Sequence, residues 1–282
     1  MSSSETSSKP QAAPEKPDWV LTPDPSTTVE RIKSVAGKVA VVTGGGRGIS
    51  AQIALGLAEG GALVAVFDIL AEPVKEEFDL ILRECPKATY YRTDVTSPES
   101  LAESFQSVLK DFGKIDICVA GAGILGDAAL IDVKESELRR QIEVNQLGVF
   151  FTIQQAARQM VAQGHGGAIL AIASIASYGS LRGQQASAYV MTKWAVRGLV
   201  RQAALELGQH GIRVNSLSPG YVQTGLSLPF ITEDKLKDWN GRIPLGRMER
   251  PDELKTPAVF LCSDAAGYIT GTDLLADGGS LC

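Results

Sequence analysis

Short apolar runs alternate with segments of helical periodicity along most of this chain. The apolar runs predict strands at Lys38–Thr43, Leu63–Asp68, Thr89–Arg92, Ile115–Ala120, Gly167–Ala173, Arg213–Ser218 and Asp273–Ala276. Apolar residues at helical spacing predict a helix that begins near Ile49 and stops at Gly60-Gly61. The same spacing predicts further helices at about Ser97–Phe112, Glu135–Gln163, Ala188–His210 and Pro251–Leu261.

The alternation of strand and helix predicts an α/β fold with a single doubly wound, Rossmann-type parallel sheet and helices on both faces. We expect one domain, at residues 36–282, with no internal repeat. The segment Gly225–Arg247 breaks the alternation, and we expect it to be an insertion or a lid. Ligands of such sheets bind at the carboxyl ends of the strands, which is where we look for chemistry.

Residues 1–35 differ in composition from the rest of the chain. The stretch Met1–Pro25 is rich in Ser, Pro, Glu and Lys, and this composition predicts a disordered N-terminal arm. The alternative is an arm that packs on its own or a neighbouring subunit through Trp19, Val20 and Leu21. The stretch has no hydrophobic signal core, and its acidic residues argue against a transit peptide.

Composition narrows the classes of function. With 44% hydrophobic and 21% charged residues, the 282-residue chain resembles an ordinary soluble protein. A formal charge of −5 disfavours binding to nucleic acid or to an anionic membrane, and no apolar stretch reaches the ~18 residues of a membrane span. The four cysteines and two histidines show no metal-ligand spacing, so we expect no metal. We expect a cytoplasmic protein with reduced thiols.

A glycine-rich loop joins the first predicted strand to the first predicted helix. Glycines at 44, 46 and 48 would let backbone N–H groups approach a pyrophosphate, and the start of the helix favours an anion, so Gly44, Gly46, Arg47, Gly48 and Ile49 are candidate contacts. A structural turn is the alternative. Asp68 ends the following strand, as expected in a dinucleotide-binding unit.

Asp68 and Arg47 carry opposite signals about the cofactor. The carboxylate of Asp68 would accept hydrogen bonds from the adenosine ribose and repel a 2′-phosphate, which selects NAD. Arg47 offers a cation to that phosphate and would favour NADP. We give the acid more weight, and predict NAD with NADP as the alternative. A solvated acid at the strand end is the remaining interpretation.

Tyr189 and Lys193 lie four residues apart on a predicted helix, and therefore on one face. A phenol is a poor acid–base catalyst at neutral pH, but a nearby cation lowers its pKa. Ser174 follows the apolar strand Gly167–Ala173, where its hydroxyl can bind the oxygen of a reacting carbonyl or alcohol. Asn145 interrupts an apolar helical stretch, and its plain interpretation is a buried amide that satisfies backbone groups.

Together these residues resemble the short-chain dehydrogenase/reductase family, classical type, from about Gly37 to Cys282. The family loop Thr-Gly-x-x-x-Gly-x-Gly matches Thr43–Ser50, with Ser50 in place of the last glycine. The family's Asn-Ala-Gly motif matches Gly121-Ala122-Gly123, without the asparagine. The remaining motifs match the adenine pair Asp94-Val95, the tetrad Asn145, Ser174, Tyr189 and Lys193, the element Pro219–Thr224, and the C-terminal signature from Ile269 to Gly279.

The resemblance implies hydride transfer between a nicotinamide cofactor and a carbonyl or alcohol. Tyr189 would be the acid or base, Lys193 would lower its pKa and bind the nicotinamide ribose, Ser174 would orient the substrate, and Asn145 would hold a relay water. Further cofactor contacts implied by the resemblance are Asp94, Val95, Gly121, Ala122, Asn145, Tyr189, Lys193, Pro219, Gly220, Val222 and Thr224.

The resemblance also implies a homotetramer, or a homodimer, that acts on a small-molecule substrate. The segment Gly225–Arg247 and the loop between Ser174 and Tyr189 are similar to those of fungal polyol and ketose reductases. A ketone, alcohol or cyclic imine of secondary metabolism is an equal alternative. Two other classes remain: a non-redox isomerase or cyclase on the same fold, and a dinucleotide sensor without turnover.

Overall fold

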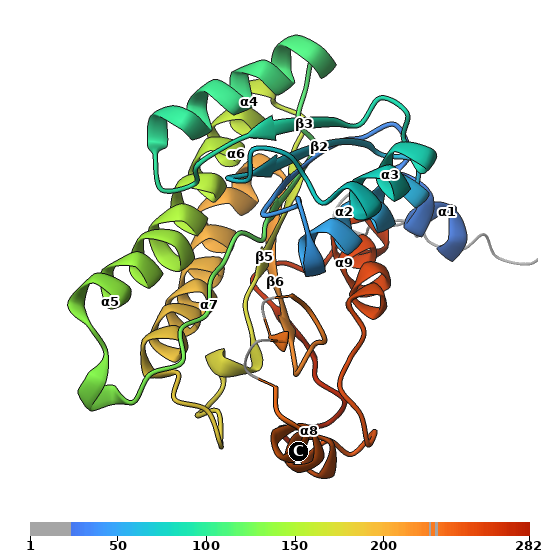
Figure 1. The fold of residues 1–282 in the computed structure, drawn as a ribbon. Coiled ribbons are helices and arrows are strands. Elements are labelled where there is room, and N and C mark those ends of the chain that lie inside the picture. The colour runs from blue at the N-terminus through green and yellow to red at the C-terminus, as the bar shows by residue number, and fades with distance from the viewer. Residues whose placement is uncertain (1–23, 226, 229–230) are drawn as a thin grey trace, which may run out of the picture.

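A computed structural model describes residues 24–225, 227–228 and 231–282. Its centre is a parallel sheet of seven strands in the order β3-β2-β1-β4-β5-β6-β7 (Figure 1). The strands are β1 Val39–Thr43, β2 Leu63–Asp68, β3 Thr89–Arg92, β4 Ile117–Ala120, β5 Gly167–Ile172, β6 Ile212–Pro219 and β7 Asp273–Ala276. The strand order reverses between β1 and β4, which opens a crevice at their carboxyl ends.

Helices cover both faces of the sheet and divide the core into two clusters. Alternate residues of β1 point to opposite faces, so Val39 and Val41 join one cluster and Ala40 and Val42 the other. The first cluster includes α4 Pro98–Phe112, α6 Val149–Gln163 and α7 Ser187–Leu207. The second includes α2 Gly48–Glu59, α3 Lys75–Glu84 and α9 Lys255–Cys262 (Figure 1). This arrangement confirms the predicted doubly wound parallel sheet with helices on both faces.

Two helical features differ from the sequence-based expectation. No helix was expected between Asp68 and Thr89, but α3 lies there and buries Ile81. The predicted helix Glu135–Gln163 is divided into α5 Glu135–Ile142, a π-helical turn η3 at Glu143–Gly148, and α6. The wider turn of η3 buries Asn145. This polar residue, which interrupts the apolar stretch of the sequence, therefore lies where the helix is irregular.

Residues 28–35 of the N-terminal segment are helical, which differs from the disorder predicted for residues 1–35. Helix α1 Thr28–Ile32 begins with a capping box between Thr27 and Glu30, and Val35 of the following turn is fully buried. Residues 1–23, including the Trp19, Val20 and Leu21 of the alternative prediction, lie outside the described residues.

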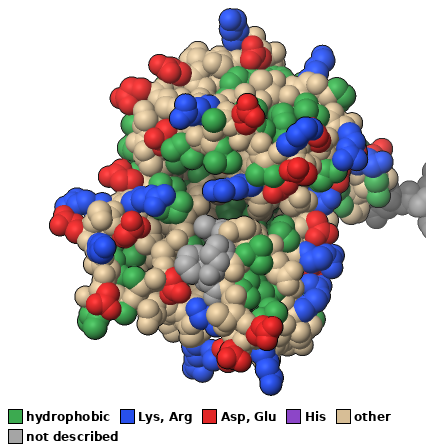
Figure 2. All heavy atoms as spheres, in the orientation of Figure 1, with side chains coloured by type: hydrophobic (Ala, Val, Ile, Leu, Met, Phe, Trp, Pro, Cys, Tyr) green, Lys and Arg blue, Asp and Glu red, His purple; other side chains and the backbone are tan. Residues whose placement is uncertain are grey.

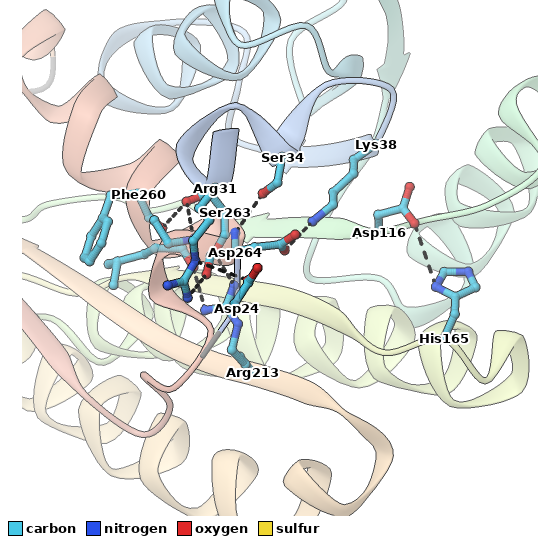
Figure 3. Close-up of polar contacts among 12 residues, drawn as sticks. Asp24, Arg31, Ser34, Lys38, Asp116, His165, Arg213, Phe260, Ser263 and Asp264 are labelled. Carbon is cyan, nitrogen blue, oxygen red and sulfur yellow. Dashed lines mark hydrogen bonds and ion pairs between the residues drawn. The ribbon is translucent and has the colours of Figure 1, made fainter. Parts of the chain in front are cut away.

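Helix α1 is held against the C-terminal part of the fold through Asp264 (Figure 3). Arg31 donates to the carbonyl oxygen of Asp264 at 2.9 Å, and the Asp264 N–H donates to the Ser34 hydroxyl at 2.8 Å. Lys38, at the start of β1, forms an ion pair with the Asp264 carboxylate at 2.9 Å. These contacts make residues 31–38 a packed part of the domain.

The segment Gly225–Arg247 contains α8 Glu233–Arg242. Trp239 of this helix is buried with Ile243 and Met248 in a small cluster of its own. Leu226, Pro229 and Phe230, which belong to the predicted lid, lie outside the described residues. None of the helices that the structure describes is long and apolar enough to cross a membrane. On the face shown in Figure 2, acidic and basic side chains are interspersed and form no single basic patch.

Candidate active site

A cavity of about 1040 Å³ lies at the carboxyl ends of the central strands. One end is formed by the glycine-rich loop and Asp68, and the other by Ser174, Tyr189 and α8. Most of the predicted site residues line it: Gly44, Arg47, Gly48, Ile49, Asp68, Asp94, Val95, Gly121, Ala122, Ser174, Tyr189, Lys193, Pro219, Gly220, Val222 and Thr224. The predicted residues Gly46 and Asn145 do not form part of the cavity wall.

The glycine-rich loop runs from the end of β1 into α2. Gly44 has φ +67°, and a Cβ there would lie 2.7 Å from the Cα of Ala122, so only glycine fits. The Gly46 N–H donates to a carboxylate oxygen of Asp68 at 3.0 Å. The Gly48 N–H donates to both carboxylate oxygens of Glu77, at 2.9 and 3.1 Å. The loop is therefore held by two acids of its own chain.

Ser174, Tyr189 and Lys193 meet at the opposite end of the cavity. Ser174 follows β5, where its hydroxyl also accepts the Ala176 N–H at 3.1 Å. Tyr189 and Lys193 lie on α7, and the Lys193 ammonium is 5.6 Å from the centre of the Tyr189 ring. The Lys193 ammonium donates to the carbonyl oxygen of Ile172 at 2.7 Å. Strand β5 and helix α7 thus bring an alcohol, a phenol and an amine together.

Burial dominates the electrostatics of this end of the cavity. It raises the pKa of Tyr189 above its usual value, and a hydrogen bond with Ser174 lowers it in part. Burial lowers the pKa of Lys193 to about 8. The sequence predicted that Lys193 lowers the pKa of Tyr189. In this structure the Lys193 ammonium donates to the Ile172 carbonyl, and the lowering stays a prediction. Burial thus disfavours the charged forms of both Tyr189 and Lys193, which is common for acids and bases at functional sites.

Asn145 is fully buried in the π-helical turn and braces the chain after β4. Its side-chain oxygen accepts the Ile124 N–H at 2.8 Å, and its side-chain nitrogen donates to the Ile124 carbonyl at 2.9 Å. The same nitrogen donates to the Thr192 hydroxyl at 3.1 Å. This amide satisfies backbone groups, as its plain interpretation predicted, and it ties the loop that contains Ile124 to α7.

The remaining wall, toward α8, mixes aromatic and polar side chains. Tyr221 and Trp239 are stacked with their ring centres 4.7 Å apart. Lys235 of α8 forms an ion pair with Asp127 at 3.6 Å, and the other Asp127 oxygen accepts the Gln185 N–H at 3.0 Å. Asp127 therefore connects α8 to the loop that precedes Tyr189.

Similarity to known proteins identifies the family. A family model described as Enoyl-(Acyl carrier protein) reductase matches residues 44–280. The L-rhamnose 1-dehydrogenase (NAD(P)(+)) of Sphingomonas sp. (strain SKA58) is 36% identical over 253 residues, which cover 88% of this chain and 98% of that protein. The cyclohexanol dehydrogenase of Acinetobacter sp. (strain SE19) is 36% identical over 242 residues, which cover 86% and 94%.

The solved structures agree with these relatives. A short-chain type dehydrogenase/reductase from Mycobacterium marinum superposes with a TM-score of 0.87 at 40% identity, over 91% of this chain and all of that one. The chain belongs to the short-chain dehydrogenase/reductase family. It is an NAD(P)-dependent oxidoreductase that transfers a hydride between a nicotinamide cofactor and the alcohol or carbonyl group of a small molecule.

The residues of this short-chain dehydrogenase/reductase fit such a cofactor. The cavity is large enough for an elongated ligand, because drug-sized ligands occupy roughly 300–1,000 Å³. Gly44 and Gly48 both have positive φ, and Gly48 opens α2, whose first N–H groups favour a phosphate. Asp68 lines the end of the cavity formed by the glycine-rich loop, where a carboxylate could accept hydrogen bonds from ribose hydroxyls.

Several residues that line the cavity of this short-chain dehydrogenase/reductase were given no role by sequence reasoning, among them Glu77, Asp127 and Lys235, whereas Trp239 belongs to the segment predicted as a lid. Helical periodicity in Lys75–Glu84 could have placed Glu77 on a helix, but its contact with Gly48 is tertiary. Asp127 and Lys235 lie in segments without a motif. The described residues contain no cluster of His, Cys, Asp or Glu that could hold a metal ion.

Proposed function

We propose that this enzyme prefers NAD(H) and acts on the secondary alcohol or ketone of a polyhydroxylated small molecule, such as a sugar or polyol. The observation that carries the proposal is a single cavity with a glycine-rich loop and Asp68 at one end, and with Ser174, Tyr189 and Lys193 at the other. A dinucleotide bound along this cavity would bring its nicotinamide to the side chains that handle the proton.

In the proposed mechanism, the bound nicotinamide supplies or accepts the hydride, and the side chains control the proton. Tyr189 gives its phenolic proton to the carbonyl oxygen during reduction, and takes the hydroxyl proton during oxidation. Ser174 donates a hydrogen bond to the same substrate oxygen and orients it. Lys193 stabilises the Tyr189 phenolate and binds the nicotinamide ribose. Asn145 acts as the relay residue between Lys193 and solvent, with Ile124 held in place by its amide.

The cofactor contacts proposed for the rest of the cavity follow its wall. Asp68 would hold the adenosine ribose, Asp94 and Val95 would contact the adenine, and Gly121 and Ala122 would contact the dinucleotide between its two ends. The loop residues Gly44, Arg47, Gly48 and Ile49 would surround the pyrophosphate, with Gly46 in the same loop behind the wall, and Pro219, Gly220, Val222 and Thr224 would lie at the nicotinamide.

The wall beyond the nicotinamide end supports the substrate class. Asp127, Lys235 and Gln184 offer both donors and acceptors to the cavity, which suits a molecule with several hydroxyl groups. Asp127 and Lys235 neutralise each other, so this pair contributes no net charge to attract an ionic substrate. Tyr221, which stacks on the buried Trp239, adds an apolar side chain to this wall for a ring or a carbon chain.

A panel of purified substrates tests the proposal. Sugars, polyols, cyclohexanols and hydroxysteroids are each offered with NAD+ and NADP+, and absorbance of the reduced nicotinamide is followed. We expect the highest kcat/KM for a sugar or polyol with NAD+. Preferential turnover of an apolar cyclic alcohol would contradict the substrate class, and absence of turnover with every alcohol and ketone would contradict the reaction.

We also propose that the enzyme is a cytoplasmic homotetramer, or a homodimer. The apolar side chains of Phe150, Met191 and Trp194 are 43%, 45% and 48% exposed on α6 and α7, which supports burial against a second copy. The four free cysteines support a reducing compartment. Light scattering at micromolar concentration tests the assembly, and a monomer mass would contradict it. Cell fractionation tests the location.

A further inference from the structure

Two carboxylates hold the glycine-rich loop at the end of the cavity where adenosine is proposed to bind. Asp68 accepts the Gly46 N–H, and Glu77 accepts the Gly48 N–H through both of its oxygens. Asp68 belongs to the end of β2, whereas Glu77 comes from the first turn of α3. Two N–H groups of the loop that could otherwise serve an anion are thus occupied by acids of the same chain.

Glu77 also lies within the electrostatic reach of Arg47. Burial raises the pKa of Glu77, while the Gly48 N–H, the Gln52 side chain and the positive charge of Arg47 each lower it. Arg47 is exposed at the start of α2 and lines the cavity beside Glu77. Arg92, on the neighbouring β3, donates to the Ile69 carbonyl and does not line the cavity. The positive charge of Arg47 at this end of the cavity is therefore offset by the negative charge of Glu77.

We propose that Glu77 is a specificity-determining residue for the cofactor, which acts with Asp68 to exclude the 2′-phosphate of NADP(H). The inference rests on the proposed NAD(H) dependence of the enzyme. The hydroxyl groups of an unphosphorylated ribose donate hydrogen bonds to carboxylates. A 2′-phosphate carries nearly two negative charges, and it meets two carboxylates and an Arg47 whose charge Glu77 already offsets.

This arrangement separates the roles of the two acids. Asp68 is placed to contact the ribose, so its loss weakens the binding of NADH and relieves part of the repulsion of NADPH. The charge of Glu77 repels the 2′-phosphate and offsets the charge of Arg47. It therefore weakens the binding of NADPH and changes the binding of NADH much less. Removing Asp68 alone should therefore leave a measurable preference for NADH.

The test is direct binding of NADH and NADPH, which requires no substrate. Glu77→Gln keeps the size of the side chain and an oxygen that can accept the Gly48 N–H, and removes only the charge. We expect the Kd for NADPH to fall about tenfold, as for one charged interaction, and the Kd for NADH to change by less than about threefold. Glu76→Gln is the matched control, because Glu76 is an exposed acid on the same turn of α3.

A second pair of variants tests whether Glu77 acts through Arg47. Arg47→Gln in the wild-type background should change the Kd for NADPH little, because Glu77 already opposes this cation. Arg47→Gln in the Glu77→Gln background should cancel most of the gain in NADPH binding. If Glu77→Gln does not fold, as judged by circular dichroism, Glu77→Ala is measured in the same way.

Three results would overturn the inference. Equal weakening of both cofactors in Glu77→Gln would show that Glu77 only braces the loop, and an unchanged Kd for NADPH would show that its charge is irrelevant. An equal effect of Glu76→Gln would show a general effect of net charge. If the wild-type enzyme binds neither cofactor, the proposed function fails as well, which distinguishes that failure from a failure of this inference alone.

Discussion

The hydroxyl oxygen of Ser50 lies 3.3 Å from the carbonyl oxygen of Gly121, in the space that a side chain at residue 121 would need. A Cβ at residue 121 would lie only 2.3 Å from that hydroxyl oxygen. Both residues depart from the family motifs, with Ser50 in place of glycine and Gly121 in place of asparagine. The two departures are complementary, because the side chain missing from one position makes room for the one added at the other.

The first prediction concerns this pair. Gly121→Asn should lower the free energy of unfolding by about 2 kcal/mol, because overfilling a packed site typically costs 1–3 kcal/mol. Ser50→Gly combined with Gly121→Asn should recover at least half of that loss. Chemical denaturation of the two variants and of Ser50→Gly alone measures the coupling. Strict additivity of the single effects would contradict a steric link between the two residues.

The second prediction concerns Tyr189. Tyr189→Phe keeps the ring and removes the ionisable oxygen, so turnover should fall at least ~100-fold while cofactor binding persists. Tyr178→Phe is the matched control, because this phenol lies outside the cavity wall and donates to the backbone of Asp273. Steady-state kinetics and NADH binding are measured on both variants. Turnover of Tyr189→Phe within a few-fold of wild type would remove Tyr189 from the mechanism.

The third prediction concerns the stability cost of Lys193. Its pKa falls from 10.5 to about 8 because burial disfavours the ammonium. That gap corresponds to about 3 kcal/mol of stability lost below pH 8, where the amine is charged in both folded and unfolded chains. Between about pH 8 and 10.5 the unfolded chain binds more protons, so the penalty shrinks as pH rises.

Lys193→Met should therefore be inactive but at least as stable as the wild type at pH 7. Its advantage in melting temperature should decrease at pH 9.5, because the wild-type amine is then largely neutral when folded. Thermal melts of the cofactor-free proteins at both pH values check this. A lower melting temperature of Lys193→Met at pH 7 would mean that the hydrogen bond to Ile172 outweighs the cost of burial.

The fourth prediction concerns Asp68 and the choice of cofactor. The wild-type enzyme should prefer NAD(H) by roughly tens-fold in kcat/KM, since charge-assisted hydrogen bonds contribute about 1.5–3 kcal/mol. Asp68→Ala should narrow this preference mainly by improving NADP(H). Kinetics with both cofactors, at one ionic strength, decide the matter. A wild-type preference for NADPH would mean that Arg47 outweighs the two carboxylates.

The fifth prediction concerns the ion pair between Lys235 and Asp127. Lys235→Met should raise KM for the substrate about tenfold, because α8 then loses its connection to the loop before Tyr189. The effect should fall on KM for substrate and leave the Kd for NADH unchanged. Lys237→Met is the control, since Lys237 is exposed on the same helix. Equal effects of the two variants would show that helix propensity, and not the ion pair, is responsible.

The sequence was sufficient to predict the parallel sheet and the approximate ends of its strands. Apolar runs such as that of β1 are buried on both faces of the sheet, and few structures other than a central parallel strand produce this pattern. It was less informative for α3, whose apolar residues Phe78 and Ile81 have helical spacing in a short, charged segment. The sequence was misleading for α1, because the polar composition of the N-terminal residues predicted disorder although Thr27 and Glu30 form a capping box there.

The site could be predicted as far as local motifs extend. Motif and chain order predicted that Ser174, Tyr189 and Lys193 come together, and the end of β5 and one face of α7 do position them at the cavity; their catalytic roles stay a prediction. The contact of Lys193 with the Ile172 carbonyl and that of Glu77 with Gly48 depend on packing between distant segments, which no local pattern encodes. The electrostatics of the site follow from those contacts.

The attachment of α1 to Asp264 fixes the side of the molecule from which the chain enters the sheet. Residues 31–38 lead directly into the amino end of β1. The cavity lies at the other ends of the strands, their carboxyl ends. A carrier protein or a solid support joined ahead of α1 is therefore anchored at the end opposite the entrance for substrate. The enzyme can be immobilised through this end with its entrance facing the solution.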